Sequence, residues 1–149
     1  MVGKTAPIRR QDEIRFKVIR EYTGCLCCML DRHDSAFEEI SQTTIEHVTD
    51  RGRRLADEHQ ATIGLCPWHH QATPWTGLDP REMNRILGPS LANGRKPFEE
   101  HYGDEVDVLL RIQDELILAF ADNPWQEYTV PRAVREMARE LWKKLKRNE

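Results

Sequence analysis

The stretch Cys66-Pro67-Trp68-His69-His70 places one thiol and two imidazoles, three potential metal ligands, within five residues. Two upstream segments match it. Cys25-Leu26-Cys27-Cys28 contains a C-x2-C pair, and Glu46-His47 sets a carboxylate beside an imidazole. We expect these three segments to meet in space and to form two metal sites.

The spacing of the ligands favours a closed zinc site. Seventeen residues separate Cys28 from Glu46, and eighteen separate His47 from Cys66. A tight C-x2-C or C-x2-H turn lets two ligands reach one tetrahedral ion, and a site with four protein ligands is structural. The predicted structural zinc ligands are Cys25, Cys28, Cys66 and His69. We expect Cys27 to be a buried free thiol, although it could substitute for Cys28.

Composition restricts the class of protein. The chain has 149 residues, of which 39% are hydrophobic and 32% charged, and this suits a folded domain. No apolar run approaches the roughly 18 residues of a membrane span, and Met1 to Arg10 lacks the apolar core of a signal peptide. We therefore expect a cytoplasmic protein that contacts no membrane, in which reduced cysteines bind metal.

Charge is unevenly distributed along the chain. The net charge of −3 argues against a protein that coats nucleic acid along its whole surface. Nine acidic residues lie between positions 99 and 127, whereas seven basic residues lie between 132 and 147. A third basic group, Arg51, Arg53 and Arg54, follows the Glu46-His47 pair. Any surface that binds phosphates must therefore be local.

Hydrophobic periodicity and turn residues predict an α+β fold. The apolar positions of 12–22 fit one face of a helix, although 14, 16 and 18 also alternate like a strand. Strands are expected at 43–48 and 61–65, with a helix starting at Pro67. Further helices are expected from 79 to 87, from 104 to 121 and from 131 to 146. The predicted organisation is a flexible basic N-terminus (1–10), a metal-binding domain (11–103) and a C-terminal helical extension (104–149).

The order of these motifs resembles that of the HNH (ββα-metal) endonucleases. The resemblance covers about residues 20–75 and implies a zinc-stapled ββα-metal core with surrounding helices. Glu46 stands where an Asp is commoner, His70 stands where an Asn is commoner, and His69 replaces a cysteine. Two runs, Glu46-His47-Val48-Thr49 and Gly52-Arg53-Arg54-Leu55, are also similar to the phage recombination-enhancement (Ref) family. So are Ile63 to His70, Lys96-Pro97-Phe98 and Tyr102-Gly103, which extend the likeness to about residue 118. That resemblance implies a RecA-dependent DNA nuclease from a phage or a bacterial host, with a RecA filament as a partner.

The residues themselves suit phosphodiester hydrolysis. A neutral histidine is a good general base at cytoplasmic pH, and we assign this role to His47. Glu46 and His70 could hold one divalent ion, Mg²⁺ or Mn²⁺ or else Zn²⁺, and leave coordination positions open for phosphate and water. Adjacent histidines at the start of a helix point about 100° apart, so His69 and His70 could exchange roles. The predicted DNA contacts are Arg51, Arg53 and Arg54, with Arg95 and Lys96 as weaker candidates.

Two other functions fit the same residues. The main alternative is a non-catalytic, zinc-stabilised module that binds DNA or a partner. A further alternative is an effector-type nuclease that attacks RNA or foreign DNA. His33, His59 and His101 are expected to be surface or hydrogen-bonded histidines, and His59 is the one that lies between the dyad and Cys66. The oligomeric state stays open.

Overall fold

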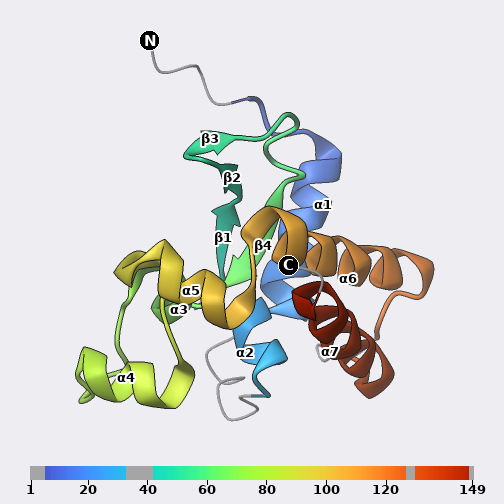
Figure 1. The fold of residues 1–149 in the computed structure, drawn as a ribbon. Coiled ribbons are helices and arrows are strands. Elements are labelled where there is room, and N and C mark those ends of the chain that lie inside the picture. The colour runs from blue at the N-terminus through green and yellow to red at the C-terminus, as the bar shows by residue number, and fades with distance from the viewer. Residues whose placement is uncertain (1–5, 33–41, 127–129, 148–149) are drawn as a thin grey trace.

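The computed structural model describes residues 6–32, 42–126 and 130–147 (Figure 1). His33 lies outside this part of the chain. The strands are β1 (Thr44–His47), β2 (Thr49–Asp50), β3 (Arg53–Arg54) and β4 (Thr62–Leu65). The helices are α1 (Arg10–Val18), η1 (Ile19–Thr23), α2 (Leu26–Leu30), α3 (Pro67–Gln71), α4 (Pro80–Leu87), η3 (Leu91–Asn93), α5 (Arg95–Tyr102), η4 (Glu105–Leu109), α6 (Leu110–Asp122) and α7 (Arg132–Arg147). The α+β class is therefore confirmed.

Two short antiparallel ladders form the sheet structure. β1 pairs with β4 in a register that places Glu46 opposite Ile63 and His47 opposite Thr62. β2 pairs with β3 in a separate hairpin. Its turn contains Arg51 at φ 52° and Gly52 at φ 79°, both in the left-handed region that a tight two-residue hairpin turn requires. The chain thus runs from β1 through the hairpin to β4 and directly into α3.

The inner strand β4 is buried along its whole length and packs against α6 and η1. The Gln113 side chain on α6 accepts a hydrogen bond from the Gly64 backbone N–H over 3.0 Å. A Cβ on Gly64 would collide with the Gly24 carbonyl oxygen and with the Ile19 side chain. The close approach of η1 to β4 therefore requires glycine at this position.

The helix α3 begins as its sequence predicts. Cys66 is the N-cap, Pro67 occupies the first turn, and Ala72 ends the helix at φ 57°. The next helix, α4, is capped by Asp79, whose side chain accepts a hydrogen bond from the Glu82 N–H over 2.8 Å. These caps fix where the two helices start.

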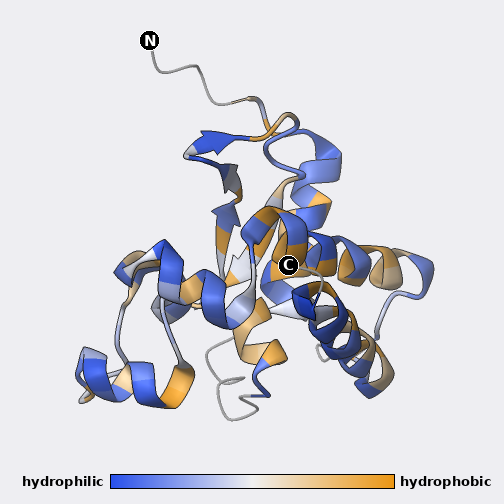
Figure 2. Cartoon of the chain, in the orientation of Figure 1, coloured by the Kyte–Doolittle hydropathy of each residue, from blue (hydrophilic) through white to orange (hydrophobic). Residues whose placement is uncertain are grey.

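The C-terminal helices α6 and α7 pack against β4 and α2. α7 packs against α2, α6 and η4 (Figure 1). Both α6 and α7 carry hydrophobic and hydrophilic residues, whereas β3 is hydrophilic (Figure 2). On α7, Ala138 and Leu145 are buried, whereas Met137 is 37% exposed. Among the described residues, no helix combines the length and apolar character needed to cross a bilayer.

The N-terminal segment is attached to the loop before β4. The Ala6 N–H donates to the Glu58 carboxylate over 2.7 Å, and Arg9 pairs with Asp12 and Asp57. Gln60 donates a further hydrogen bond to Asp12 over 2.7 Å. Residues 6–9 therefore form a strap across the 57–60 loop, and α1 begins directly after them.

Candidate metal centres

Cys25, Cys28, Cys66 and His69 form one buried cluster, and their ligand atoms lie within 4.8 Å of one another. His69 Nδ1 is 3.4, 3.5 and 3.2 Å from the sulfurs of Cys25, Cys28 and Cys66. The Cys28 and Cys66 sulfurs are 4.0 Å apart. A tetrahedral zinc ion with ordinary bond lengths separates two sulfurs by about 3.8 Å and a sulfur from a nitrogen by about 3.6 Å. The cluster is consistent with structural zinc.

The two ligand pairs, Cys25 with Cys28 and Cys66 with His69, each start with a cysteine that is the N-cap of a short helix. The Cys25 sulfur accepts the Cys28 backbone N–H at the start of α2, and the Cys66 sulfur accepts the His69 N–H at the start of α3. In each case the free backbone N–H groups at the helix start hold the first sulfur ligand in place. Cys27 is buried but lies outside the four-ligand cluster, as predicted.

A second layer of hydrogen bonds orients the His69 ring. Its Nε2 lies 2.7 Å from the Leu87 carbonyl oxygen and 2.9 Å from the Tyr102 hydroxyl. Because a carbonyl oxygen only accepts, His69 carries a hydrogen on Nε2, and Nδ1 is the nitrogen that faces the sulfurs. Tyr102 in turn donates to Asp31 over 2.8 Å. Such outer partners fix the tautomer of a metal-binding histidine.

The pKa values of the clustered groups are shifted in opposite directions. Burial opposes ionisation of Cys25, but hydrogen bonds from neighbouring thiols lower its pKa well below the usual range. Hydrogen bonds to Cys25 and Cys66, together with burial, raise the pKa of Cys28. Burial alone would lower the pKa of His69, but the Cys25 thiolate raises it to about 10. Protons thus hold the cluster together when no ion is bound, and a divalent ion would displace them.

Glu46 on β1 and His70 on α3 form a second pair. The His70 Nε2 lies 2.6 Å from the Glu46 carboxylate, and both side chains are about one-fifth exposed, at 20% and 17%. The His70 Nδ1 lies 2.6 Å from the Thr44 hydroxyl, which donates to the Leu65 carbonyl over 2.8 Å. His69 and His70 thus divide between the two groups: His69 contacts the sulfurs, and His70 contacts the carboxylate.

The polarity of the contact with Glu46 follows from its acceptor. A carboxylate accepts, so His70 donates its Nε2–H to Glu46 over 2.6 Å. A divalent ion held by both groups would take the place of this hydrogen and set the two atoms about 3 Å apart. The donor set of one imidazole and one carboxylate fits a divalent ion that keeps open positions.

His47 closes β1 and contacts a second histidine. Its Nε2 lies 3.0 Å from Nδ1 of His59, whose Nε2 lies 2.7 Å from the Ala6 carbonyl oxygen. Burial lowers the pKa of His47, and the neighbouring Arg54 and His59 lower it further. The imidazole is therefore neutral at neutral pH, as a general base must be.

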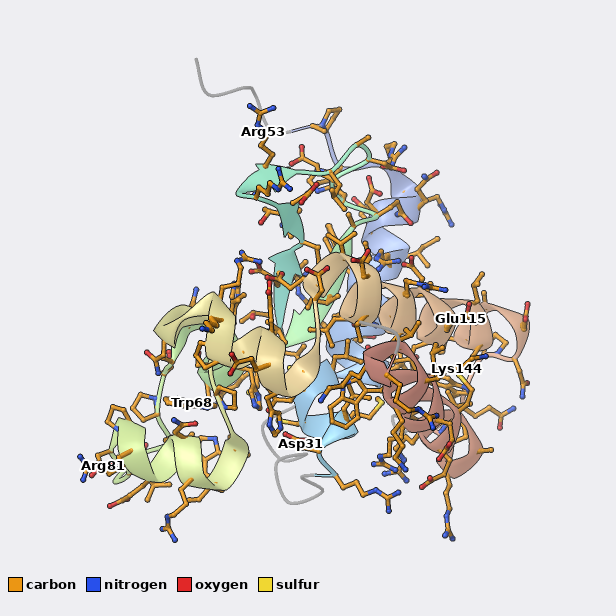
Figure 3. The ribbon with its side chains drawn as sticks, viewed as in Figure 1. Asp31, Arg53, Trp68, Arg81, Glu115 and Lys144 are labelled. Carbon is orange, nitrogen blue, oxygen red and sulfur yellow. The ribbon has the colours of Figure 1, made fainter. Side chains whose placement is uncertain are left out.

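The predicted arginine group lies on the β2–β3 hairpin. Arg51, Arg53 and Arg54 are all exposed there. Arg53 extends from the hairpin into solvent (Figure 3). Arg54 pairs with Glu58 over 2.5 Å, beside the strap. The hairpin follows directly after His47, so its positive charge lies next to the end of β1.

The weaker candidates Arg95 and Lys96 start α5, where they share a shallow hollow of about 480 Å³ with Glu99 and Glu100. Arg95 pairs with the buried Glu105 over 2.6 Å. Burial raises the pKa of Glu105 to about 7, Arg95 opposes this shift, and the nearby Glu46 carboxylate adds to it. The mixed charge makes this hollow a poorer phosphate contact than the hairpin.

Several contacting residues had no signal in the sequence. Thr44, Tyr102 and Glu105 read as ordinary strand or helix positions, because their roles depend on contacts across 10 to 71 residues of chain. Only His59 stood out, through its position between the dyad and Cys66. His101 is partly exposed and bonds Asp31, as expected of a surface histidine.

Comparison with known proteins gives one clear result. The family model described as "Recombination enhancement, RecA-dependent nuclease" matches residues 7–117, from before α1 into α6. No curated protein and no solved structure gives a match. The matched span includes the Glu46–His70 and His47–His59 pairs and all four cysteines, and it excludes α7.

Proposed function

Because the chain belongs to the family of recombination-enhancement, RecA-dependent nucleases, we propose that it hydrolyses DNA phosphodiester bonds at an HNH-type site. The site consists of β1, β4 and α3, with His47 as the general base. The observation that carries this proposal is the pairing of the Glu46 carboxylate with the His70 imidazole, 2.6 Å apart at the end of the strand that carries His47. A purely structural zinc protein has no need of this pair.

The residues divide the work as follows. His47 takes a proton from the attacking water, because its neutral ring has a free nitrogen. Glu46 and His70 would hold a divalent ion, which would supply positive charge to the leaving oxygen. Thr44 keeps the His70 ring turned so that its Nε2 faces Glu46. Cys25, Cys28, Cys66 and His69 take no part in the reaction and fix α3 through zinc.

The placement of base and metal site suits in-line displacement. Successive residues of a strand point to opposite faces, so the side chains of Glu46 and His47 leave β1 on different sides. Attacking water and leaving oxygen must also lie on opposite sides of the phosphorus. A phosphate bound at the end of β1 would therefore meet the base on one side and the metal site on the other.

The decisive experiment is a cleavage panel with matched variants. His47→Ala should bind zinc and fold normally but lose cleavage of DNA in the presence of RecA and ATP, with Mg²⁺ or Mn²⁺. His101→Ala, which removes an exposed histidine outside the Glu46–His70 and His47–His59 pairs, should cut like the parent. Undiminished cutting by His47→Ala would rule out the assignment. DNA binding without any product from the parent, across single-stranded, duplex and branched substrates, would favour the binding-module alternative.

The hairpin is the proposed DNA-contact surface. Arg53→Ala should weaken DNA binding and lower the salt slope of the binding constant by about one counterion. Arg81→Ala is the matched control, because Arg81 is exposed on α4, away from the hairpin (Figure 3). Equal effects of the two variants would show that the hairpin makes no specific contribution.

A further inference from the structure

His59 is a buried histidine with both ring nitrogens bonded. It is 4% exposed, its Nδ1 lies 3.0 Å from His47 Nε2, and its Nε2 lies 2.7 Å from the Ala6 carbonyl oxygen. The Phe16 ring stands edge-on to both imidazoles, with centroid distances of 6.3 Å to His47 and 5.8 Å to His59. The two rings therefore have a fixed arrangement.

The hydrogen-bond polarity can be read from the carbonyl end. The Ala6 carbonyl only accepts, so His59 donates its Nε2–H there and keeps a lone pair on Nδ1. That lone pair accepts the Nε2–H of His47. A neutral His47 consequently carries no proton on its own Nδ1, and this is the nitrogen left to act as a base.

The backbone around His59 is also fixed relative to His47. Thr62 is the register partner of His47, and its hydroxyl donates to the His59 carbonyl over 3.0 Å. The buried Arg15 donates to that same hydroxyl over 2.9 Å. On the other side, Glu58 accepts the Ala6 N–H over 2.7 Å. Strand, loop and strap thus fix both partners of the His59 ring.

We propose that His59 is a positioning residue for His47, acting with the Ala6 carbonyl to fix the tautomer and the direction of the base. This inference rests on the proposed function of His47. The strap at residues 6–9 is then part of the active site, although Ala6 lies 41 residues before His47 in the sequence.

The test separates positioning from folding. His59→Ala should lower kcat by about 10- to 100-fold, the range expected when a reacting group loses its alignment. The KM for DNA, the zinc content and the melting temperature should change little. His59→Asn keeps an acceptor oxygen near the Nδ1 position and should recover most of the lost kcat, whereas His59→Leu should not. Wild-type kcat in His59→Ala, or equal losses in the Asn and Leu variants, would overturn the proposal.

A spectroscopic readout needs no turnover. In protein with nitrogen-labelled histidine, at a pH where both rings are neutral, a scalar coupling should connect His47 Nε2 with His59 Nδ1. His59→Ala should abolish it, and absence of the coupling in the parent would refute the arrangement. If the parent shows the coupling but His47→Ala still cuts DNA, the proposed function fails while the hydrogen bond stands. The two failures are therefore distinguishable.

Discussion

The neighbouring cysteines Cys27 and Cys28 provide a matched test of the zinc centre. Both are buried on α2, but only Cys28 belongs to the ligand cluster. Replacing either with alanine removes a group of similar size from the same helix. Only Cys28→Ala should also remove a metal ligand, so the difference between the two variants measures the zinc contribution.

The size of that contribution follows from the chain between the ligands. A zinc ion that joins Cys25 to His69 closes a loop of about 45 residues, and a covalent cross-link of that span stabilises a fold by about 4 kcal/mol. In a chain of this length about 1 kcal/mol shifts the melting temperature by about 3 °C, so Cys28→Ala should lower it by about 12 °C. Cys27→Ala loses one small buried group, about 1 kcal/mol or roughly 3 °C.

Metal analysis and calorimetry check this result. The parent and Cys27→Ala should each contain about one zinc per chain, and Cys28→Ala should contain none. A chelator should bring the parent to the melting temperature of Cys28→Ala and leave that variant unchanged. Equal losses of stability in the two variants, or a retained zinc in Cys28→Ala, would refute the reasoning.

Three further predictions concern the region around β1. Thr44→Val removes the hydroxyl that bonds His70 Nδ1, so metal affinity in the cleavage assay should fall about 10- to 100-fold with little change in the melting temperature. Since the pKa of His47 is lowered, kcat/KM should fall as pH drops through a value below 6.5 and stay level above it; Arg54→Ala removes one cause of the shift and should move this acidic limb to higher pH. Gly64→Ala should lower the stability measured by urea unfolding by several kcal/mol, because its Cβ meets backbone and an apolar side chain.

The sequence predicted those parts of the site that depend on local geometry. A C-x2-C or C-x2-H spacing builds a helix cap whose two ligands converge whatever surrounds it, so the four members of the buried cluster could be named in advance. The strand before His47 and the helix after Cys66 carried equally local signals. The helix α5 was missed because only Phe98 and Tyr102 are buried on it, a pattern too sparse to stand out.

Contacts between distant segments were beyond such reasoning. The pairing of His47 with His59 depends on a strap that returns over the loop, and neither segment shows periodicity that indicates it. The division between His69 and His70 likewise needed the direction of α3 relative to β1. Each of these facts concerns the packing of elements, whereas the sequence patterns concern the elements one at a time.

The helix α3 links the proposed zinc centre to the proposed catalytic site. A five-residue helix has no independent stability, so its direction must come from outside contacts. Its sulfur and imidazole ligands, Cys66 and His69, attach one face to α2, while the bond from Thr44 attaches His70 to β1. Because His69 and His70 are adjacent on this rigid turn, orienting one ring also orients the other. Loss of zinc should therefore abolish cleavage even at temperatures where the rest of the chain stays folded, and a zinc-free protein that still cuts DNA would contradict this coupling.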